Sequence, residues 1–227
     1  MDWIYDIFEF SKKYPLDFTQ MSFWIFFVIV YAGFALTYKR LFIRNLFLFL
    51  VSCFFYYKTS GLFVMLLLFS TVTDFYFGRQ IDKSEDEGRR KLFVTLSVCL
   101  NLFVLSYFKY AYFFTDAYNT IFHTDHKVFN YLAYWGNGFH SKGYFSVDEI
   151  VLPVGISFYT FQTISYTVDI YRRKLKSLDS ILDFGLYVTF FPQLVAGPIV
   201  RAEEFVPQIL RPTQITQADF NKATYFI

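Results

Sequence analysis

The chain has 227 residues, of which 55% are hydrophobic, 24% aromatic and 18% charged, and its formal net charge is +2. Soluble globular domains carry about 25% charged residues, so this composition argues against an ordinary soluble protein. The apolar residues occur in blocks instead of at helical or strand period, which is typical of bilayer-spanning segments. The small net charge gives no reason to expect nucleic-acid binding, and the two cysteines show neither disulfide nor metal-ligand spacing.

Residues 1–20 are predicted to form a helix that lies in the membrane interface. The chain opens MDWIYDIFEF, with acids where a secretory signal would carry basic residues. A helix here places apolar side chains on one face and acids on the other, which is the pattern of an interfacial helix. The apolar face consists of Trp3, Ile4, Ile7 and Phe8, and the acidic face of Asp2, Asp6 and Glu9.

Six apolar blocks follow, and each is long enough to be a membrane segment. A transmembrane helix needs about 20 mostly apolar residues, with a range of roughly 17 to 25. No block carries more than one charged residue. The blocks are 18–38, 41–57, 62–78, 92–114, 150–170 and 184–200. The sequence therefore predicts an all-α, polytopic transmembrane protein in which residues 1–227 belong to a single helical domain.

The charged residues inside these blocks stand toward the block ends. Arg44 is close enough to one end for its long side chain to reach the interface. Asp74 and Asp169 lie near basic loops, where Arg79 and Arg172 could pair with them. These positions indicate anchoring at the interface, because a charge at the bilayer centre costs roughly 2.5 to 3.5 kcal/mol on insertion scales.

Lysine and arginine are concentrated in alternate loops, twelve against five. Loops rich in these residues are retained in the cytoplasm. The richer loops follow the first, third and fifth blocks, so the N-terminus is predicted to lie on the extracytoplasmic side of the membrane. The polar stretch 115–149 is then an extracytoplasmic loop.

This loop contains all three histidines, His123, His126 and His140. The sequence HTDH could supply two metal ligands from one helix face, but zinc needs three or four ligands and no second pair is evident. Solvated loop histidines are the favoured interpretation, and no metal site is predicted. The sequence GNG at 136–138 predicts a turn.

The fifth block carries a polar stripe along one helical face. It reads IVLPVGISFYTFQTISYTVDIYR, and at 100° per residue its polar positions fall together. Lipid cannot satisfy amides, phenols or carboxylates, so the stripe must face protein or water. Lining of a cavity and hydrogen bonding between helices are equally good explanations. The stripe consists of Gly155, Tyr159, Gln162, Tyr166 and Asp169.

The sixth block is interrupted in the sequence FFPQLVAGPIVRAEEF. Pro192 and Pro198 lack the N–H that a helix needs, and Gly197 loosens the backbone between them. Carbonyls left unpaired at membrane depth are tolerated only where they are buried in protein or line a water-filled cavity. With Gln193 and Arg201 on either side, the break predicts a polar passage, and a simple kinked helix is the alternative. The pattern leaves open whether the block crosses the membrane or re-enters it.

Four motifs, in this order, resemble the membrane-bound O-acyltransferase family, specifically its bacterial alginate O-acetylase-like branch. They are STVTDFYFGR, NLFVLSYFKYAYFF, LPVGISFYTFQTISYTVDIYR and FFPQLVAGPIVRAEEF. The resemblance runs from about Leu41 to the last residue, interrupted by the loop 115–149. It implies a ring of tilted helices around a tunnel across the bilayer, of which this chain is the N-terminal portion.

The resemblance also implies an activity, the transfer of an acyl group that is usually acetyl. The donor would be acetyl-CoA or an acylated carrier on the cytoplasmic side, with no bound cofactor. The acceptor would be an extracytoplasmic polysaccharide or a periplasmic acetyltransferase partner. Tunnel-lining roles are carried over to Tyr159, Gln162, Tyr166, Asp169, Gln193, Gly197, Pro198 and Arg201.

In the family the catalytic histidine stands on a later apolar helix, which the resemblance places beyond Ile227. The three histidines of the outer loop are in a different context, so no catalytic residue is assigned, and this portion alone is expected to be inactive. Two other classes stay open. A transporter-like subunit would also use broken helices, and a noncatalytic membrane scaffold could dock a soluble acyltransferase.

Overall fold

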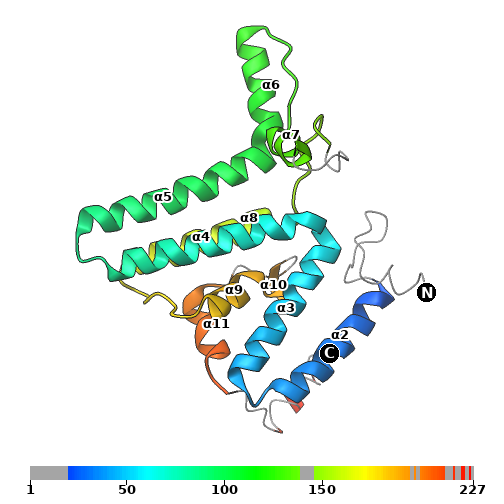
Figure 1. Ribbon diagram of the computed structural model, residues 1–227, viewed down its shortest axis with the longest axis vertical. Coiled ribbons are helices and arrows are strands. Elements are labelled where there is room, and N and C mark those ends of the chain that lie inside the picture. The colour runs from blue at the N-terminus through cyan, green and yellow to red at the C-terminus, as the bar shows by residue number, and fades with distance from the viewer. Residues whose placement is uncertain are drawn as a thin grey trace.

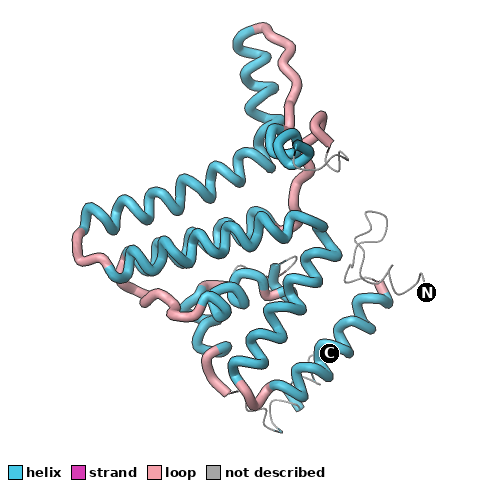
Figure 2. Tube along the Cα trace, in the orientation of Figure 1, coloured by secondary structure: helices cyan, strands magenta, loops and turns pink. Residues whose placement is uncertain are grey.

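Figure 1 shows a computed structural model of the chain, which describes residues 20–138, 146–194, 197, 200–212, 217, 221, 222 and 225. Within these residues every regular element is a helix, as the sequence predicted (Figure 2). The predicted interfacial helix comprises residues 1–20, and all of these except Gln20 lie outside the described part of the chain. The elements are α2 (Met21–Thr37), α3 (Leu41–Ser60), η1 (Gly61–Phe63), α4 (Val64–Lys83), α5 (Glu87–Leu105), η2 (Ser106–Tyr110), α6 (Ala111–Phe122), α7 (Tyr131–Gly138), α8 (Ile156–Tyr171), α9 (Ile181–Thr189), α10 (Phe191–Leu194) and α11 (Ala202–Ile209).

Two continuous helical stretches in the described residues are long and apolar enough to cross a membrane, Leu41–Lys83 and Glu87–Phe122. The first has 43 residues and would be about 65 Å long if straight, roughly twice the hydrocarbon core of a bilayer. It turns at Gly61, whose φ of 63° ends α3, so that α3 and α4 meet at a corner (Figure 1). α3 and α4 thus correspond to the predicted segments 41–57 and 62–78.

The second stretch bends at η2, a five-residue π-helical turn, and α6 leaves α5 at a steep angle (Figure 1). The helix continues to Phe122, where His123 ends it with a left-handed φ of 52°. The first residues of the predicted extracytoplasmic loop 115–149 are therefore helical, because the aromatic run after Lys109 extends the helix. The predicted turn at 136–138 is wrong, since these residues form the last turn of α7.

Helices α4, α5 and α8 pack against one another and form the main core. Close packing requires a small residue at Gly78 on α4, because a Cβ atom there would lie 2.8 Å from Cε1 of Tyr166. The Tyr166 ring is fully buried on α8 and packs on Phe184 at 4.5 Å between ring centroids. Interfaces of membrane helices are rich in such small residues, since lipid supplies no hydrophobic force between helices.

A buried hydrogen-bonding network lies inside this three-helix core. Asp74 is 1% exposed and accepts hydrogen bonds from Ser97 Oγ at 2.7 Å and from Asn101 Nδ2 at 2.9 Å. Asn101 Oδ1 in turn accepts from Thr163 Oγ1 at 3.1 Å. The expected pair of Asp74 with Arg79 does not form, since the carboxylate points into the core.

Arginine side chains also cap helix ends. Arg90 is 3% exposed and donates to Ile81 O at 3.0 Å and to Tyr171 O at 2.6 Å, so one guanidinium satisfies carbonyls at the ends of α4 and α8. Arg44, predicted to reach the interface, is instead 2% exposed and donates to Arg211 O at 3.0 Å. A fork of five donors suits such unpaired carbonyls.

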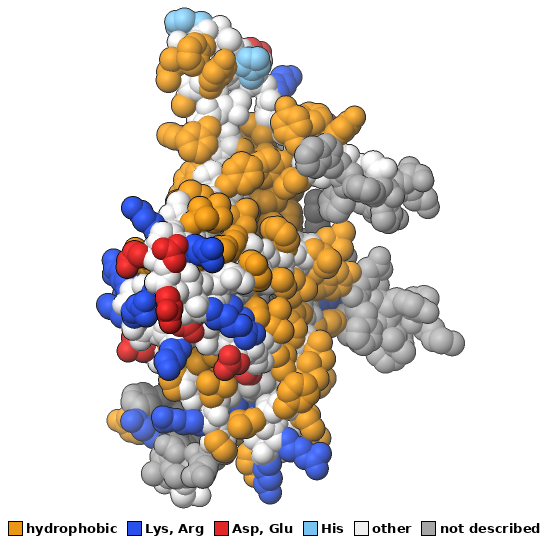
Figure 3. All heavy atoms as spheres, turned by 60° about the vertical axis from the view of Figure 1, so that its left-hand side comes forward, with side chains coloured by type: hydrophobic (Ala, Val, Ile, Leu, Met, Phe, Trp, Pro, Cys, Tyr) orange, Lys and Arg blue, Asp and Glu red, His pale blue; other side chains and the backbone are white. Residues whose placement is uncertain are grey.

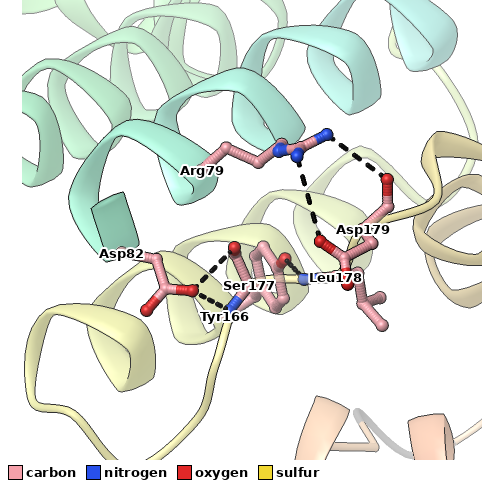
Figure 4. Close-up of polar contacts among 6 residues, drawn as sticks. All are labelled: Arg79, Asp82, Tyr166, Ser177, Leu178 and Asp179. Carbon is pink, nitrogen blue, oxygen red and sulfur yellow. Dashed lines mark hydrogen bonds and ion pairs between the residues drawn. The ribbon is translucent and has the colours of Figure 1, made fainter. Parts of the chain in front are cut away.

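The loop between α8 and α9 is fastened to the end of α4 (Figure 4). Arg79 donates to Asp179 O at 3.4 Å, and its guanidinium lies 3.8 Å from the Asp179 carboxylate. Asp82 accepts from Ser177 N at 3.0 Å and from Ser177 Oγ at 2.8 Å. These contacts fix the path along which the chain leaves α8 and begins α9.

Candidate functional site

The polar stripe of the fifth block lies on α8, but this helix begins only at Ile156, six residues later than expected. Gly155 stands at its N-terminal cap with φ of 73°, a left-handed conformation that favours glycine. A Cβ atom at Gly155 would lie 2.5 Å from the carbonyl oxygen of Leu194. The start of α8 therefore touches the broken segment directly.

Three residues of the stripe are buried, and two of them hydrogen-bond backbone groups. Gln162 Nε2 donates to Tyr187 O at 2.8 Å, and the Tyr166 hydroxyl accepts from Leu178 N at 2.9 Å. The hydroxyl of Tyr159 makes no hydrogen bond within the described residues, although the hydroxyl of Tyr56 lies near it. Asp169 is half-buried and forms no ion pair with another described residue, so the expected pair with Arg172 is absent.

The predicted break in the sixth block is present, and it begins at Phe190, ahead of both prolines. α9 ends at Thr189, and Phe190 has ψ of 106°, outside the helical range. In a continuous helix Phe191 N would donate to Tyr187 O. Here Phe191 N donates to Ser52 Oγ on α3 at 3.3 Å. The break thus transfers one backbone donor to a side chain of another helix.

The carbonyl left by this break is satisfied by two glutamines. Tyr187 O accepts from Gln162 Nε2 at 2.8 Å and from Gln193 Nε2 at 3.2 Å. The structure thus brings together two predicted site residues that are 31 positions apart. Their amides serve the broken backbone, so the polar groups around Tyr187 find partners inside the protein.

Gly197 and Arg201, the other predicted residues of the break that the structure describes, form no hydrogen bond with this carbonyl. Gly197 N donates to Gln193 O at 3.0 Å, and a Cβ atom at Gly197 would lie 2.5 Å from Gln193 Cα, so only glycine fits. Pro198 lies outside the described residues. Arg201 is exposed and stands at the N-terminal cap of α11.

Sequence reasoning missed several residues of this site, namely Ser52, Tyr56 and Tyr187. Ser52 and Tyr56 lie inside an apolar block whose composition predicts a plain membrane helix, and Tyr187 is the one hydroxyl-bearing aromatic residue in the sixth block. The spacing of Ser52 and Tyr56 could have indicated a polar site, since the two residues are four positions apart and share a helix face.

Four buried side-chain oxygens have no hydrogen-bond partner within the described residues. They belong to Ser60, Tyr159, Thr160 and Thr189. Thr189 is the last residue of α9, directly before the break, and the other three lie at the adjoining ends of α3 and α8. Hydroxyl groups can donate and accept, so this region offers hydrogen bonds to a water molecule or a polar ligand.

An open cavity of about 340 Å³ lies elsewhere, where α5, η2 and α6 meet the segment 127–131. None of the predicted site residues lines it. His123 and His126 are exposed, and the described residues contain no group of three His, Cys, Asp or Glu side chains suited to a metal ion. His140 lies outside the described residues. The cavity is lined by Phe103, Ser106, Tyr107, Ala111, Phe114, Thr115, Lys127, Val128, Phe129, Tyr131 and Ile150.

The chain is similar to bacterial proteins named as O-acetylases. It is 33% identical over 185 residues to the probable alginate O-acetylase AlgI of Pseudomonas aeruginosa, which covers 81% of this chain and 33% of the relative. It is 35% identical over 166 residues to the same-named protein of Azotobacter vinelandii, covering 73% and 30%. It is 30% identical over 188 residues to the peptidoglycan O-acetyltransferase of Helicobacter pylori, covering 72% and 32%.

No protein-family model and no solved structure matches the chain. The chain spans about one third of the length of the curated relatives it matches. Within that third the similarity extends over most of this chain, and it agrees with the four motifs. The chain therefore belongs to the alginate O-acetylase-like branch of the membrane-bound O-acyltransferases.

Proposed function

We propose that the complete protein is a membrane-bound O-acyltransferase that transfers an acyl group, in the simplest case acetyl, to hydroxyl groups of a cell-surface polysaccharide. The observation that carries this proposal is the 30–35% identity to relatives named as O-acetylases over most of this chain. The relatives' names give alginate or peptidoglycan as the acetylated polymer. The described residues would form the N-terminal third of the helical ring, with six membrane segments.

The distribution of charge supports a sidedness for the proposed reaction. The donor, acetyl-CoA or an acylated carrier, would approach from the cytoplasm, and the acceptor would be an extracytoplasmic polysaccharide or a periplasmic acetyltransferase partner. Charged side chains gather around the ends of α4 and α5 and the loop after α8, while the surface beside them is largely hydrophobic (Figure 3). A cytoplasmic location of these ends in the inner membrane, with the N-terminus outside, accords with the positive-inside rule.

The chemistry of such a transfer needs a base and an oxyanion site. A histidine from a later part of the protein would take the acceptor hydroxyl proton, a step worth about 10² to 10⁴ in rate. Hydrogen-bond donors would stabilise the oxyanion formed at the acyl carbonyl. From this chain, Tyr159, Thr160 and Thr189 would offer hydroxyls beside the break, and Gln162 and Gln193 would hold the break in shape.

The exposed guanidinium of Arg201 would meet an anionic group of the donor. In the complete protein we expect Arg201→Ala to lower polymer acetylation by about tenfold, the factor that corresponds to losing roughly 1.4 kcal/mol of a charge-assisted contact. The measurement is ester-linked acetate released from the polymer of a deletion strain that expresses each variant. Arg211→Ala is the matched control, because Arg211 is also exposed and stands just beyond the other end of α11.

Unchanged acetylation in the Arg201→Ala strain would remove Arg201 from the donor site. A complete protein that restores no acetylation would contradict the proposed enzyme, provided that it reaches the membrane at the normal level. A noncatalytic scaffold would then be the better interpretation, if acetylation returned only with a soluble acyltransferase partner.

A further inference from the structure

The two ends of the broken segment meet at a single side chain of α3. Asn45 Nδ2 lies 2.7 Å from Asp183 Oδ1, in the first turn of α9, and 3.2 Å from the carbonyl oxygen of Ile209, at the end of α11. One amide group therefore bonds both the start and the end of this part of the chain. A segment that crossed the membrane would have these ends about 30 Å apart.

Contacts between the ends show that the chain returns along its own path. The rings of Tyr187 and Phe205 lie 5.8 Å apart between centroids, and those of Phe190 and Phe205 lie 5.1 Å apart. The Tyr187 hydroxyl donates to Val200 O at 3.2 Å. α9 and α11 are thus neighbours, α9 packs on α3, and the end of α11 meets the start of α3 at Asn45.

The depth of the segment in the bilayer can be estimated from the positions along α3 that it contacts. α3 has 20 residues and is about 30 Å long, close to the thickness of the hydrocarbon core. The segment starts beside Asn45, and its residue Phe191 lies beside Phe55, with 5.3 Å between the ring centroids. These ten residues of α3 correspond to about 15 Å. Phe191 therefore lies past the middle of the bilayer.

We infer that residues 181–211 form a re-entrant segment that enters and leaves the membrane on the side where α3 begins, and that Arg44 and Asn45 are the positioning residues that hold its two ends together. Arg44 donates to Arg211 O at 3.0 Å and also to Ile209 O, and its Nε donates to Asn45 Oδ1 at 3.1 Å. Its positive charge lies at the C-terminal end of α11, where a helix favours a cation.

This arrangement has a consequence for the rest of the protein. Residues after Arg211 begin on the same side of the membrane as Arg44, so the next membrane segment of the complete protein starts there. Arg201 stands eight residues from Ile209, about 12 Å along α11. By the charge distribution this side is the cytoplasm, so Arg201 would be reached from the donor side.

Labelling of single cysteines tests the topology without using activity. In the complete protein with its other cysteines replaced by serine, the exposed position Lys176→Cys lies before the segment and the exposed position Leu210→Cys lies at its end. We expect both to react with a membrane-impermeant maleimide in inverted vesicles and to stay unreacted in spheroplasts. Gly88→Cys is the control for the same side, and Asp125→Cys for the opposite side.

Reaction of Leu210→Cys in spheroplasts, together with Asp125→Cys, would overturn the inference, because the segment would then cross the membrane. This outcome leaves the proposed acyl transfer untouched. Loss of acyl transfer with the expected labelling would instead contradict the proposed function and leave the re-entrant segment standing.

The positioning role has a separate test. Cysteines at Asp183→Cys and Ile209→Cys should be joined by a short bifunctional thiol reagent, since both positions contact one amide. We expect Arg44→Ala to lower this cross-linking by about tenfold and Arg44→Lys to restore part of it, because a lysine keeps the charge at the end of α11. Arg40→Ala, which removes an exposed charge one turn earlier, should leave cross-linking unchanged. Equal cross-linking in the Arg44→Ala and Arg40→Ala variants would refute the role of Arg44.

Discussion

Asp74 is the acceptor on which the polar network of the three-helix core depends. Replacing it by alanine leaves Asn101 and Ser97 without that acceptor in a place that water does not reach. Hydrogen bonds between membrane helices are worth about 0.6 kcal/mol on average and up to roughly 1.7 kcal/mol. We expect Asp74→Ala to destabilise the protein by about 1 to 2 kcal/mol, and Asp74→Asn by less, since an amide keeps one acceptor.

The measurement is the temperature at which the detergent-solubilised protein loses its monodisperse chromatographic peak. Thr73→Ala is the matched control, because the neighbouring hydroxyl bonds only Phe69 O of its own helix, at 2.7 Å. If the Asp74→Ala and Thr73→Ala variants lost the chromatographic peak at the same temperature, the network would add nothing to stability.

The sequence contains a pattern that indicates this network, but the pattern becomes visible only when three membrane segments are compared with one another. Each of the three helices contributes two polar residues four positions apart, which places them on one face. The pairs are Ser70 with Asp74, Ser97 with Asn101, and Thr163 with Thr167. Taken alone, the segment that contains Asp74 predicts that this carboxylate lies at the membrane interface near Arg79. The sequence of one helix does not show which side chains of other helices face Asp74.

At the scale of elements, the break after α9 depends on two glutamines that share one carbonyl. Either amide alone still satisfies Tyr187 O, so Gln162→Leu and Gln193→Leu should each have a modest effect. The double variant leaves a buried carbonyl without a donor, which costs about 1 to 3 kcal/mol. We expect the loss of stability in the double variant to exceed the sum of the single losses, as for residues in one network.

The same chromatographic melting assay measures this coupling in a double-mutant cycle. Gln208→Leu serves as the control, because its amide is exposed and bonds only Glu204 O within α11. Strictly additive effects of Gln162→Leu and Gln193→Leu would mean that the carbonyl has another donor. The double-mutant cycle measures stability alone, so its result does not depend on whether the proposed function is correct.

The helices themselves could be predicted from the sequence, and their ends could not. Blocks of apolar residues marked α2, α3, α4, α5 and α8, and the prolines marked the break. The break began at Phe190 because Ser52 of another helix offers a partner to Phe191 N, a contact that no local pattern contains. Likewise Arg44 is buried because α11 ends beside it, 165 positions later.

At the scale of the whole molecule, the bend at η2 determines how this part of the protein sits in the bilayer. The charged first turn of α5 ends at Lys91, and residues 92–110, up to the end of η2, span about 28 Å, which nearly equals the hydrocarbon thickness, so the helix that follows η2 has no room to continue in the same direction. α6 bends away and carries exposed aromatic residues such as Tyr118 and Phe122. Aromatic side chains favour the interface, so α6 is expected to lie along the outer surface of the bilayer.

Tryptophan fluorescence with lipids brominated at known depths tests this placement in the complete protein reconstituted without its other tryptophans. Leu102→Trp, at an exposed position near the middle of residues 92–110, should be quenched most by bromine deep in the acyl chains. Tyr118→Trp should be quenched most by bromine near the headgroups, since the bend at η2 keeps α6 close to the surface. Deep quenching at both positions would mean that α5 and α6 tilt together through the membrane, and the outer loop would then begin after Phe122.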